Sequence, residues 1–167
     1  MKPDIKNNLK LIGNNQEDLK VISAYSQDSI VTIKDMAYLK KNKIFAMIIS
    51  RFMWEDIENG LFRKNKRIKC AIKFEDVLKV KSKKINQKKK NNKLEFLAIE
   101  CNKIFNKNYE INIFFAGGSV ITLITEAIEV ILHDLGTAWN VKHLPKHKIW
   151  VLIYLIILNK STKEKGD

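Results

Sequence analysis

The stretch FFAGGSVITLITEAIEVILHDLG, residues 114–136, is the part of the sequence on which the fold prediction depends most. Gly117 and Gly118 stand between two runs of β-branched and aromatic residues. A glycine loop that binds phosphate leads from a strand directly into a helix, so that free N–H groups and the positive helix end meet the anion. Here the strand pattern continues through SVITLIT. We therefore expect a tight hairpin, in which glycine supplies positive φ without steric cost.

The second half of this stretch is expected to form a helix over residues 126–135. Thr125 is a candidate N-cap, Glu126 and Glu129 favour the N-terminal end, and Gly136 would stop the helix. One apolar stripe at helical spacing would face the rest of the protein, made of Ile128, Ile131, Leu132 and Leu135. Because such a helix is not stable alone, we expect it to cap a sheet.

The remaining sequence is mostly typical of strands. Residues 9–13 are expected to form a short strand, and residues 14–30 a helix with Asn15 as its N-cap. Two strands follow at residues 30–39 and 43–53, joined by a polar hairpin turn. Further strands are expected at residues 68–74, 76–85, 93–101 and 109–115. The predicted fold class is α+β: a strongly twisted antiparallel sheet or partial barrel, PH-like in outline, with an N-terminal helix and a C-terminal capping helix.

The length of 167 residues favours one domain, which we place at residues 1–148, followed by a tail at 149–167. The tail begins with the apolar run IWVLIYLIIL, which is about half as long as a bilayer span requires. It could pack on the domain, form a homodimer or touch a membrane surface, and we expect no membrane span. The N-terminus has no apolar run typical of a signal peptide, so the expected location is cytoplasmic.

Positive charge is concentrated in one segment. The chain carries a formal net charge of +13, and residues 63–93 hold 14 Lys or Arg against Glu75 and Asp76. Lys79, Lys81 and Lys83 are expected on one face of a strand, with Leu78 and Val80 on the other. The candidate polyanion-binding residues are Lys64, Lys66, Arg67, Lys69, Lys79, Lys81, Lys83, Lys84, Lys88, Lys89 and Lys90. The alternative is a solvated sheet edge, because the row of lysines has no interleaved aromatics to stack on bases and almost no arginine.

Other residues that could carry chemistry have a simpler structural interpretation. Cys70 and Cys101 lie in apolar strand-like runs and are expected to be small buried hydrophobes, without a disulfide. Ser119 begins a strand and is not in a nucleophile elbow. Glu129 and His133 are expected to pair on an exposed helix face. The sequence pattern assigns no catalytic, cofactor-binding or metal-binding residue. Two sets of residues have a type suited to such a role: His133, His143 and His147 as zinc ligands, and Trp54, Trp139 and Trp150 as stacking platforms.

Several blocks resemble a known family: LKLIGNNQEDLKVISAYSQDSI, DMAYLKKNKIFAMIISRFMWE, FEDVLKVKSKKI and FFAGGSVITLITEAIEVILHDLGTAW followed by LPKH. They look like an uncharacterised alphaproteobacterial family, a domain of unknown function, over roughly residues 9–148. The resemblance implies a small cytoplasmic bacterial protein and brings no catalytic residue, substrate or cofactor with it. The lysine-rich loop 86–92 is more basic than the family pattern, and relatives tend to end near His147.

The sequence therefore favours a non-enzymatic binding or adaptor module that acts on an unidentified protein partner through its surface. The alternative is weak, sequence-independent nucleic-acid binding through residues 63–93. A third hypothesis is an enzyme whose site is assembled from scattered polar residues such as Arg51, Glu55 and His133.

Overall fold

Alternating apolar and polar residues dominate the chain, and the computed structural model folds them into one antiparallel sheet. It describes residues 8–53 and 66–140. Within these residues the structure has one α-helix, α1 (Gln16–Ser26), and nine strands. The strands are β1 (Lys10–Gly13), β2 (Ile30–Leu39), β3 (Ile44–Phe52), β4 (Lys66–Phe74), β5 (Val77–Lys83), β6 (Lys93–Lys103), β7 (Tyr109–Phe115), β8 (Val120–Thr125) and β9 (Val130–Asn140).

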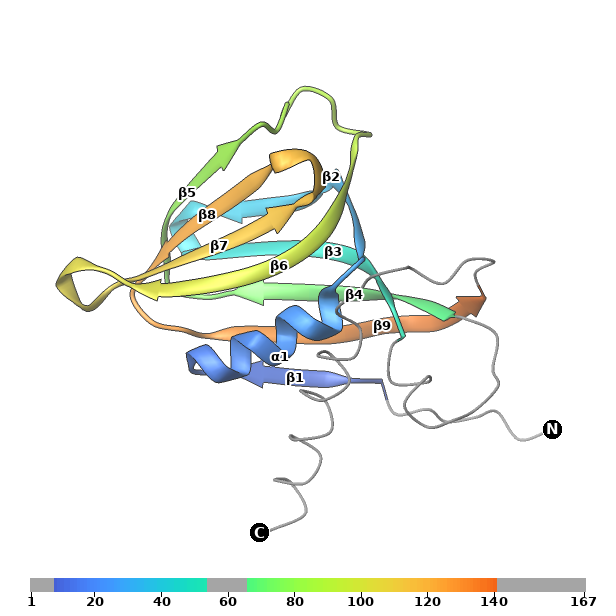
Figure 1. The fold of residues 1–167 in the computed structure, drawn as a ribbon, viewed down its shortest axis with the longest axis horizontal. Helices are drawn as coiled ribbons and strands as arrows, with labels where there is room; N and C mark the ends of the chain where they lie inside the picture. The colour runs from blue at the N-terminus through green and yellow to red at the C-terminus, as the bar shows by residue number, and fades with distance from the viewer. Residues whose placement is uncertain (1–7, 54–65, 141–167) are drawn as a thin grey trace, which may run out of the picture.

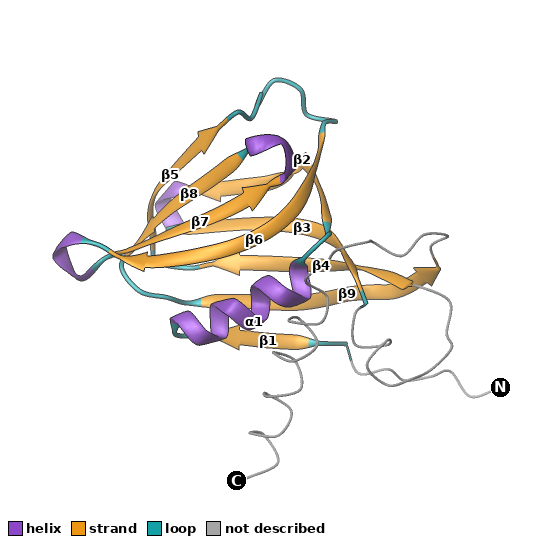
Figure 2. Ribbon diagram, in the orientation of Figure 1, coloured by secondary structure: helices purple, strands orange, loops and turns teal. Residues whose placement is uncertain are grey.

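The strands form a sheet in the order β1-β9-β4-β3-β2-β6-β7-β8-β5, and every pair is antiparallel. The sheet bends back on itself, so that β5, β6, β7 and β8 lie over β2 and β3 (Figure 1). It does not close, because β1 and β5 are the ends of the strand order. Short helical turns sit at the tips of the β2–β3, β6–β7 and β7–β8 connections (Figure 2).

The core lies on the concave face of this bent sheet. Side chains from seven strands are fully buried there, including Ile49, Ile72, Phe96, Ile113 and Leu132. Successive residues of a strand point to opposite faces, so the apolar half of each strand reaches one shared core. Phe96 and Phe115 meet edge to face, with ring centroids 6.1 Å apart. The strongly twisted antiparallel sheet predicted from the sequence is thereby confirmed.

The predicted helix near the N-terminus is also confirmed. The side chain of Asn15 accepts a hydrogen bond from the backbone N–H of Asp18 at 2.8 Å, which satisfies one of the free donors at the start of α1. Leu19 and Ile22 are buried in the core, and the hydroxyl of Ser23 accepts the backbone N–H of Ile99 in β6 at 2.9 Å. Helix α1 therefore packs against the sheet between β1 and β6.

The glycine pair forms the predicted hairpin. Gly117 and Gly118 have φ angles of 79° and 81°, in the left-handed region that favours glycine. The backbone N–H of Phe115 donates to the carbonyl of Ser119 at 2.9 Å, which closes the turn between β7 and β8. Because the chain continues into β8, no helix end is present at this turn to bind a phosphate.

The expected capping helix at residues 126–135 is wrong. Val130 begins β9, which pairs with β4 on one side and with β1 on the other. The buried residues Ile128, Val130, Leu132 and Asp134 alternate with more exposed neighbours, so the period is two and not 3.6. Thr125 is the last residue of β8 and caps no helix.

A strand at residues 130–140 predicts different effects for two leucines, which a helix would place on one apolar stripe. Leu132 is fully buried, whereas Leu135 points to the other face and is 37% exposed. We expect Leu132→Ala to lower the free energy of unfolding by about 2–5 kcal/mol. Leu135→Ala should lower it by about 1 kcal/mol or less. Urea unfolding of both variants measures the difference, and equal losses would support the helix instead.

Candidate functional site

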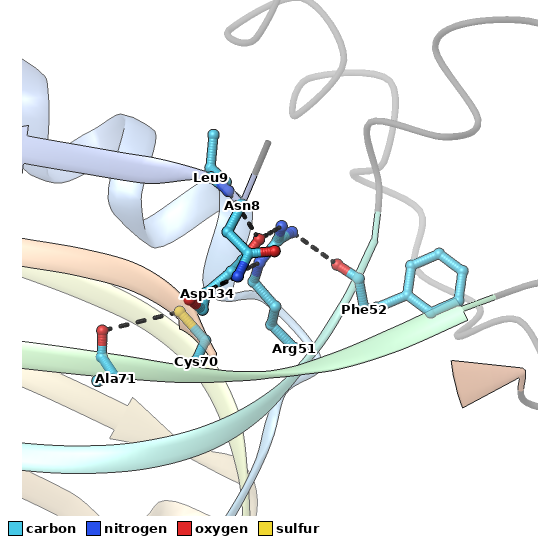
Figure 3. A network of polar contacts seen from close by, with 7 residues as sticks. All are labelled: Asn8, Leu9, Arg51, Phe52, Cys70, Ala71 and Asp134. Carbon is cyan, nitrogen blue, oxygen red and sulfur yellow. Dashed lines mark hydrogen bonds and ion pairs between the residues drawn. The ribbon is translucent and has the colours of Figure 1, made fainter. Parts of the chain in front are cut away.

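A buried ion pair crosses the concave face between β3 and β9. The guanidinium of Arg51 donates from Nε to Oδ1 of Asp134 and from Nη2 to Oδ2, both at 2.7 Å (Figure 3). The two side chains are 0% and 3% exposed. Two parallel charge-assisted bonds give this pair its geometry, and pairing is what makes two buried charges tolerable.

The carboxylate of Asp134 also fixes the start of β1. Its Oδ2 accepts the backbone N–H of Leu9 at 3.2 Å, and the backbone N–H of Asp134 donates to the carbonyl of Leu9 at 2.9 Å. Arg51 also lies over the ring of Tyr25 in α1, with Cζ 5.7 Å from the ring centroid. The pair therefore connects β3, β9, β1 and α1, which makes it a structural element of the core.

Cys70 lies beside this pair but is not a nucleophile. It is fully buried in β4, where Figure 3 shows its sulfur directed toward the carbonyl of Ala71, 3.7 Å away. Burial raises the pKa of the Cys70 thiol, and the negative charge of Asp134 raises it further. Because the thiolate is the reactive form, this thiol stays protonated and inert. Both cysteines are free, with Cys70 buried and Cys101 half-buried.

The residues named for an unrecognised enzyme site are not brought together. Arg51 faces the core, whereas His133 is exposed on the other face of β9, between Lys10 of β1 and Ala71 of β4. Glu55 lies outside the described residues. The expected helical pairing of Glu129 with His133 is also wrong, because both positions belong to an extended chain. Among the described residues, no group of three His, Cys, Asp or Glu side chains could hold a metal ion.

A cavity opens where β5, the last strand of the sheet, approaches β2 in the middle of the strand order. Between Val31 and Met36, β2 advances five residues while its partner β3 passes from Ile49 to Met47, so β2 contains a large bulge. Beyond Thr32, β2 is no longer paired with β6, and residues 35–39 have only β3 as a partner strand. We call the gap between residues 35–39 of β2 and residues 77–83 of β5 the seam.

Hydrogen bonds hold the seam together at both ends. At one end, the N–H of Val77 donates to the carbonyl of Lys43 at 2.8 Å, and the hydroxyl of Tyr38 donates to the carbonyl of Val77 at 3.3 Å. At the other end, the N–H of Lys34 donates to the carbonyl of Lys90 at 2.9 Å. The cavity between these ends has a volume of about 180 Å³. We refer to it as the seam cavity.

The seam cavity is lined by apolar side chains and, to a similar extent, by polar atoms. Its walls include Ile33, Met36, Phe45, Val80 and Ile121, contributed by β2, β3, β5 and β8. Ser82, Gln87 and Lys90 add polar groups from β5 and the loop that follows it. An apolar hollow with a few polar groups is the usual form of a binding site.

The candidate lysines divide into two groups. Lys79, Lys81 and Lys83 are exposed along β5, opposite Ile124, Thr122 and Val120 of β8, which confirms that they share one face. Leu78, expected on the face of Val80, is instead exposed at a bulge. Four further lysines are exposed in the turn and loop after β5: Lys84, Lys88, Lys89 and Lys90. Residues 77–94 contain eight lysines and no acidic residue, so the seam has a strongly basic border.

The other candidates lie in β4, at the end remote from β5. Lys69 is exposed and Lys66 is half-buried. Arg67 is committed to the fold, because its Nη1 donates to the carbonyls of Asp28 at 3.0 Å and Ser50 at 2.9 Å. Burial lowers the pKa of Arg67, opposed by the charge of Asp28. The sequence gives no sign that Arg67 binds carbonyl groups from distant parts of the chain.

Acidic side chains gather at the opposite end of β5. Glu75 and Asp76 form the turn between β4 and β5, and the N–H of Glu75 donates to the carbonyl of Glu129 at 2.9 Å. A hydrogen bond with Asp76 and repulsion from Glu75 raise the pKa of Glu129. The β5 edge is therefore polarised, with carboxylates before its first residue and lysines along and beyond it.

Several residues singled out in the sequence lie outside the described residues: Trp54, Glu55, Lys64, His143, His147, Trp150 and the apolar run 149–158. Trp139 lies in β9 and is 39% exposed, at the edge of the described fold. Helix α1, with 11 residues, is too short to cross a membrane, and no other described helix is long and apolar enough to do so.

These features define a bent, open antiparallel sheet with one helix, a buried ion pair at one end and a basic, apolar-walled seam at the other. The chain belongs to the family described as protein of unknown function (DUF2948), whose model matches residues 9–147. This match confirms the resemblance to a domain of unknown function. Neither the curated proteins nor the solved structures contain a match to the chain.

The buried pair predicts a large effect of a near-isosteric change. Asp134→Asn keeps the side-chain shape but removes the negative charge that the buried guanidinium of Arg51 faces. We expect it to lower the free energy of unfolding by about 3–5 kcal/mol. Glu126→Gln, which breaks the exposed pair of Glu126 with Lys43, is the control and should cost about 1 kcal/mol or less.

Urea unfolding measures both variants. The double variant Arg51→Met with Asp134→Leu should be more stable than Asp134→Asn alone, because it removes both buried charges. Wild-type stability of Asp134→Asn would show that the pair does not hold the core together.

Proposed function

We propose that this protein is a non-enzymatic binding module that holds a partner protein through the seam. The observation that carries the proposal is the seam cavity itself, a hollow between two strand edges that combines apolar walls with polar and basic groups. The buried ion pair supports a non-enzymatic role, because Arg51 and Asp134 bind each other and face the core. Ionisable side chains that line the cavity in the described part of the chain are Tyr38 and Lys90.

The finer features predicted from the sequence belong to this proposal. An open, strongly bent antiparallel sheet supports an outline like that of PH-like barrels. Two free cysteines support a reducing, cytoplasmic location. A homodimer formed through the tail stays a prediction, because residues 149–167 lie outside the described residues.

The proposal predicts that peptides selected on this protein bind at the seam. A displayed library of random dodecapeptides is enriched on the wild-type protein, and the affinities of the enriched peptides are measured by fluorescence anisotropy. Ala37→Trp adds an uncharged ring at the cavity lining, on a residue that is exposed in β2. We expect it to weaken binding by about tenfold or more, equivalent to about 1.4 kcal/mol of lost binding energy.

Ile12→Trp is the matched control, because Ile12 is 54% exposed in β1, at the other end of the sheet. It should leave the affinities unchanged, and thermal melting checks that both variants stay folded. Failure to enrich any peptide, or equal affinities for the two variants, would contradict the proposal.

A second function is favoured by a different observation, the exposed lysines of β5 and the following loop. Under this alternative, labelled single-stranded RNA or duplex DNA binds near physiological salt and loses affinity when Lys79, Lys81 and Lys83 become Gln. Replacing Lys10, Lys103 and Lys107 by Gln is the control with the same change in charge, since all three are exposed elsewhere. Binding that disappears above low salt, or that falls equally in both triple variants, would show that the lysines only form a solvated edge of the sheet.

A further inference from the structure

The open edge of β5 indicates how a partner would bind. Strand β5 is the last in the sheet order and pairs with β8 along one edge only. Its other edge faces the seam, where the described residues supply hydrogen bonds to Val77 alone. Alternate residues from Leu78 to Lys83 therefore direct backbone N–H and C=O groups into the seam. An extended chain beside β5 would satisfy these groups as an added strand.

The size of the seam cavity points to a side chain as its occupant. Its volume of about 180 Å³ is well below the roughly 300–1,000 Å³ typical of sites for small molecules. Val80, Phe45 and Met36 line it on one side, so an apolar side chain can pack there beside the polar groups of the rim. An added strand would deliver such a side chain, because every second residue of the strand points toward the core face.

The lysines determine the other face of the added strand. Lys79, Lys81 and Lys83 all point away from the core and lie where the outer residues of a neighbouring strand would stand beside them. Opposite charges on neighbouring strands attract, and like charges directly opposite repel. The outer residues of the partner strand are therefore acidic.

The same charges argue against a second copy of this chain at the edge. Two β5 strands paired edge to edge would place lysines against lysines, the arrangement by which edge strands avoid self-association. The carboxylate of Asp76 before β5 adds a direction, because it repels acidic residues from that end, whereas the carboxylate of Glu75 pairs with Lys73. Acidic residues of the partner are therefore favoured toward the Lys83 end.

We propose that the seam binds an extended acidic segment of a partner protein, which adds to β5 as a strand with alternating apolar and acidic residues. This inference rests on the proposed function and deepens it. Apolar side chains of the segment enter the seam cavity, and its carboxylates pair with Lys79, Lys81 and Lys83.

The test uses a fluorescein-labelled peptide of alternating glutamate and valine, with anisotropy as the readout. A peptide of the same composition with the glutamates in one block controls for net charge. Two further peptides carry N-methyl groups on alternate backbone nitrogens, one set on the odd residues and one on the even residues. N-methylation removes a backbone donor while keeping every side chain, so it tests strand pairing directly.

We expect the alternating peptide to bind at least about tenfold more tightly than the block peptide. One or both N-methylated sets should lose binding, as should the Ala37→Trp protein. Gln at Lys79, Lys81 and Lys83 should weaken binding more than Gln at Lys10, Lys103 and Lys107.

Equal binding of the alternating and block peptides, with no effect of N-methylation or of Ala37→Trp, would overturn the inference in favour of plain polyanion attraction. Library peptides that bind at the seam but tolerate N-methylation at both sets would overturn strand addition while the proposed function stands. If no peptide of either kind responds to Ala37→Trp, the proposed function fails as well.

Discussion

The bidentate pair of Arg51 with Asp134 is the interaction on which the arrangement of the sheet depends most. Its two charges lie in the core, where solvent could not take the place of the pair if they separated. The pair holds β3 and β9 across β4, and Asp134 extends the connection to β1 through the backbone of Leu9. One end of the sheet is thereby fixed in position, together with α1, which lies against it.

Strand β3 connects this fixed end to the seam. Arg51 lies near one end of its concave face, and Phe45, near the other end, lines the seam cavity. In β2 the bulge lies opposite Ile49 to Met47, and β2 is unpaired with β6 beyond Thr32. The residues of β2 next to Phe45 therefore approach β5 without pairing with it. The fold thus combines a tightly bonded region with an open edge, and this edge is the binding surface that we propose.

The elements that sequence reasoning predicts are those that neighbouring residues decide. The Asn15 cap of α1 and the glycine turn between β7 and β8 are local signals, and both are present in the structure. Strand β9 is missed because Asp134 places a charge on its buried face, and the partner that accommodates this charge is 83 residues away in the sequence. When only residues 126–135 are considered, their apolar positions fit a helical stripe better than a strand. The seam cavity also depends on pairing between distant strands, so no local pattern reveals it.

The central claim is that the free edge of β5 accepts a partner strand, and amide hydrogen exchange followed by NMR tests it most directly. The exchange of each backbone amide is measured in the free protein and in the protein saturated with the tightest peptide from the library selection. The account predicts that alternate amides between Leu78 and Lys83 exchange rapidly in the free protein and become protected in the complex, while those of β1 are unchanged. Unchanged exchange along β5 in a saturated complex, or protection that appears at β1 instead, would contradict it.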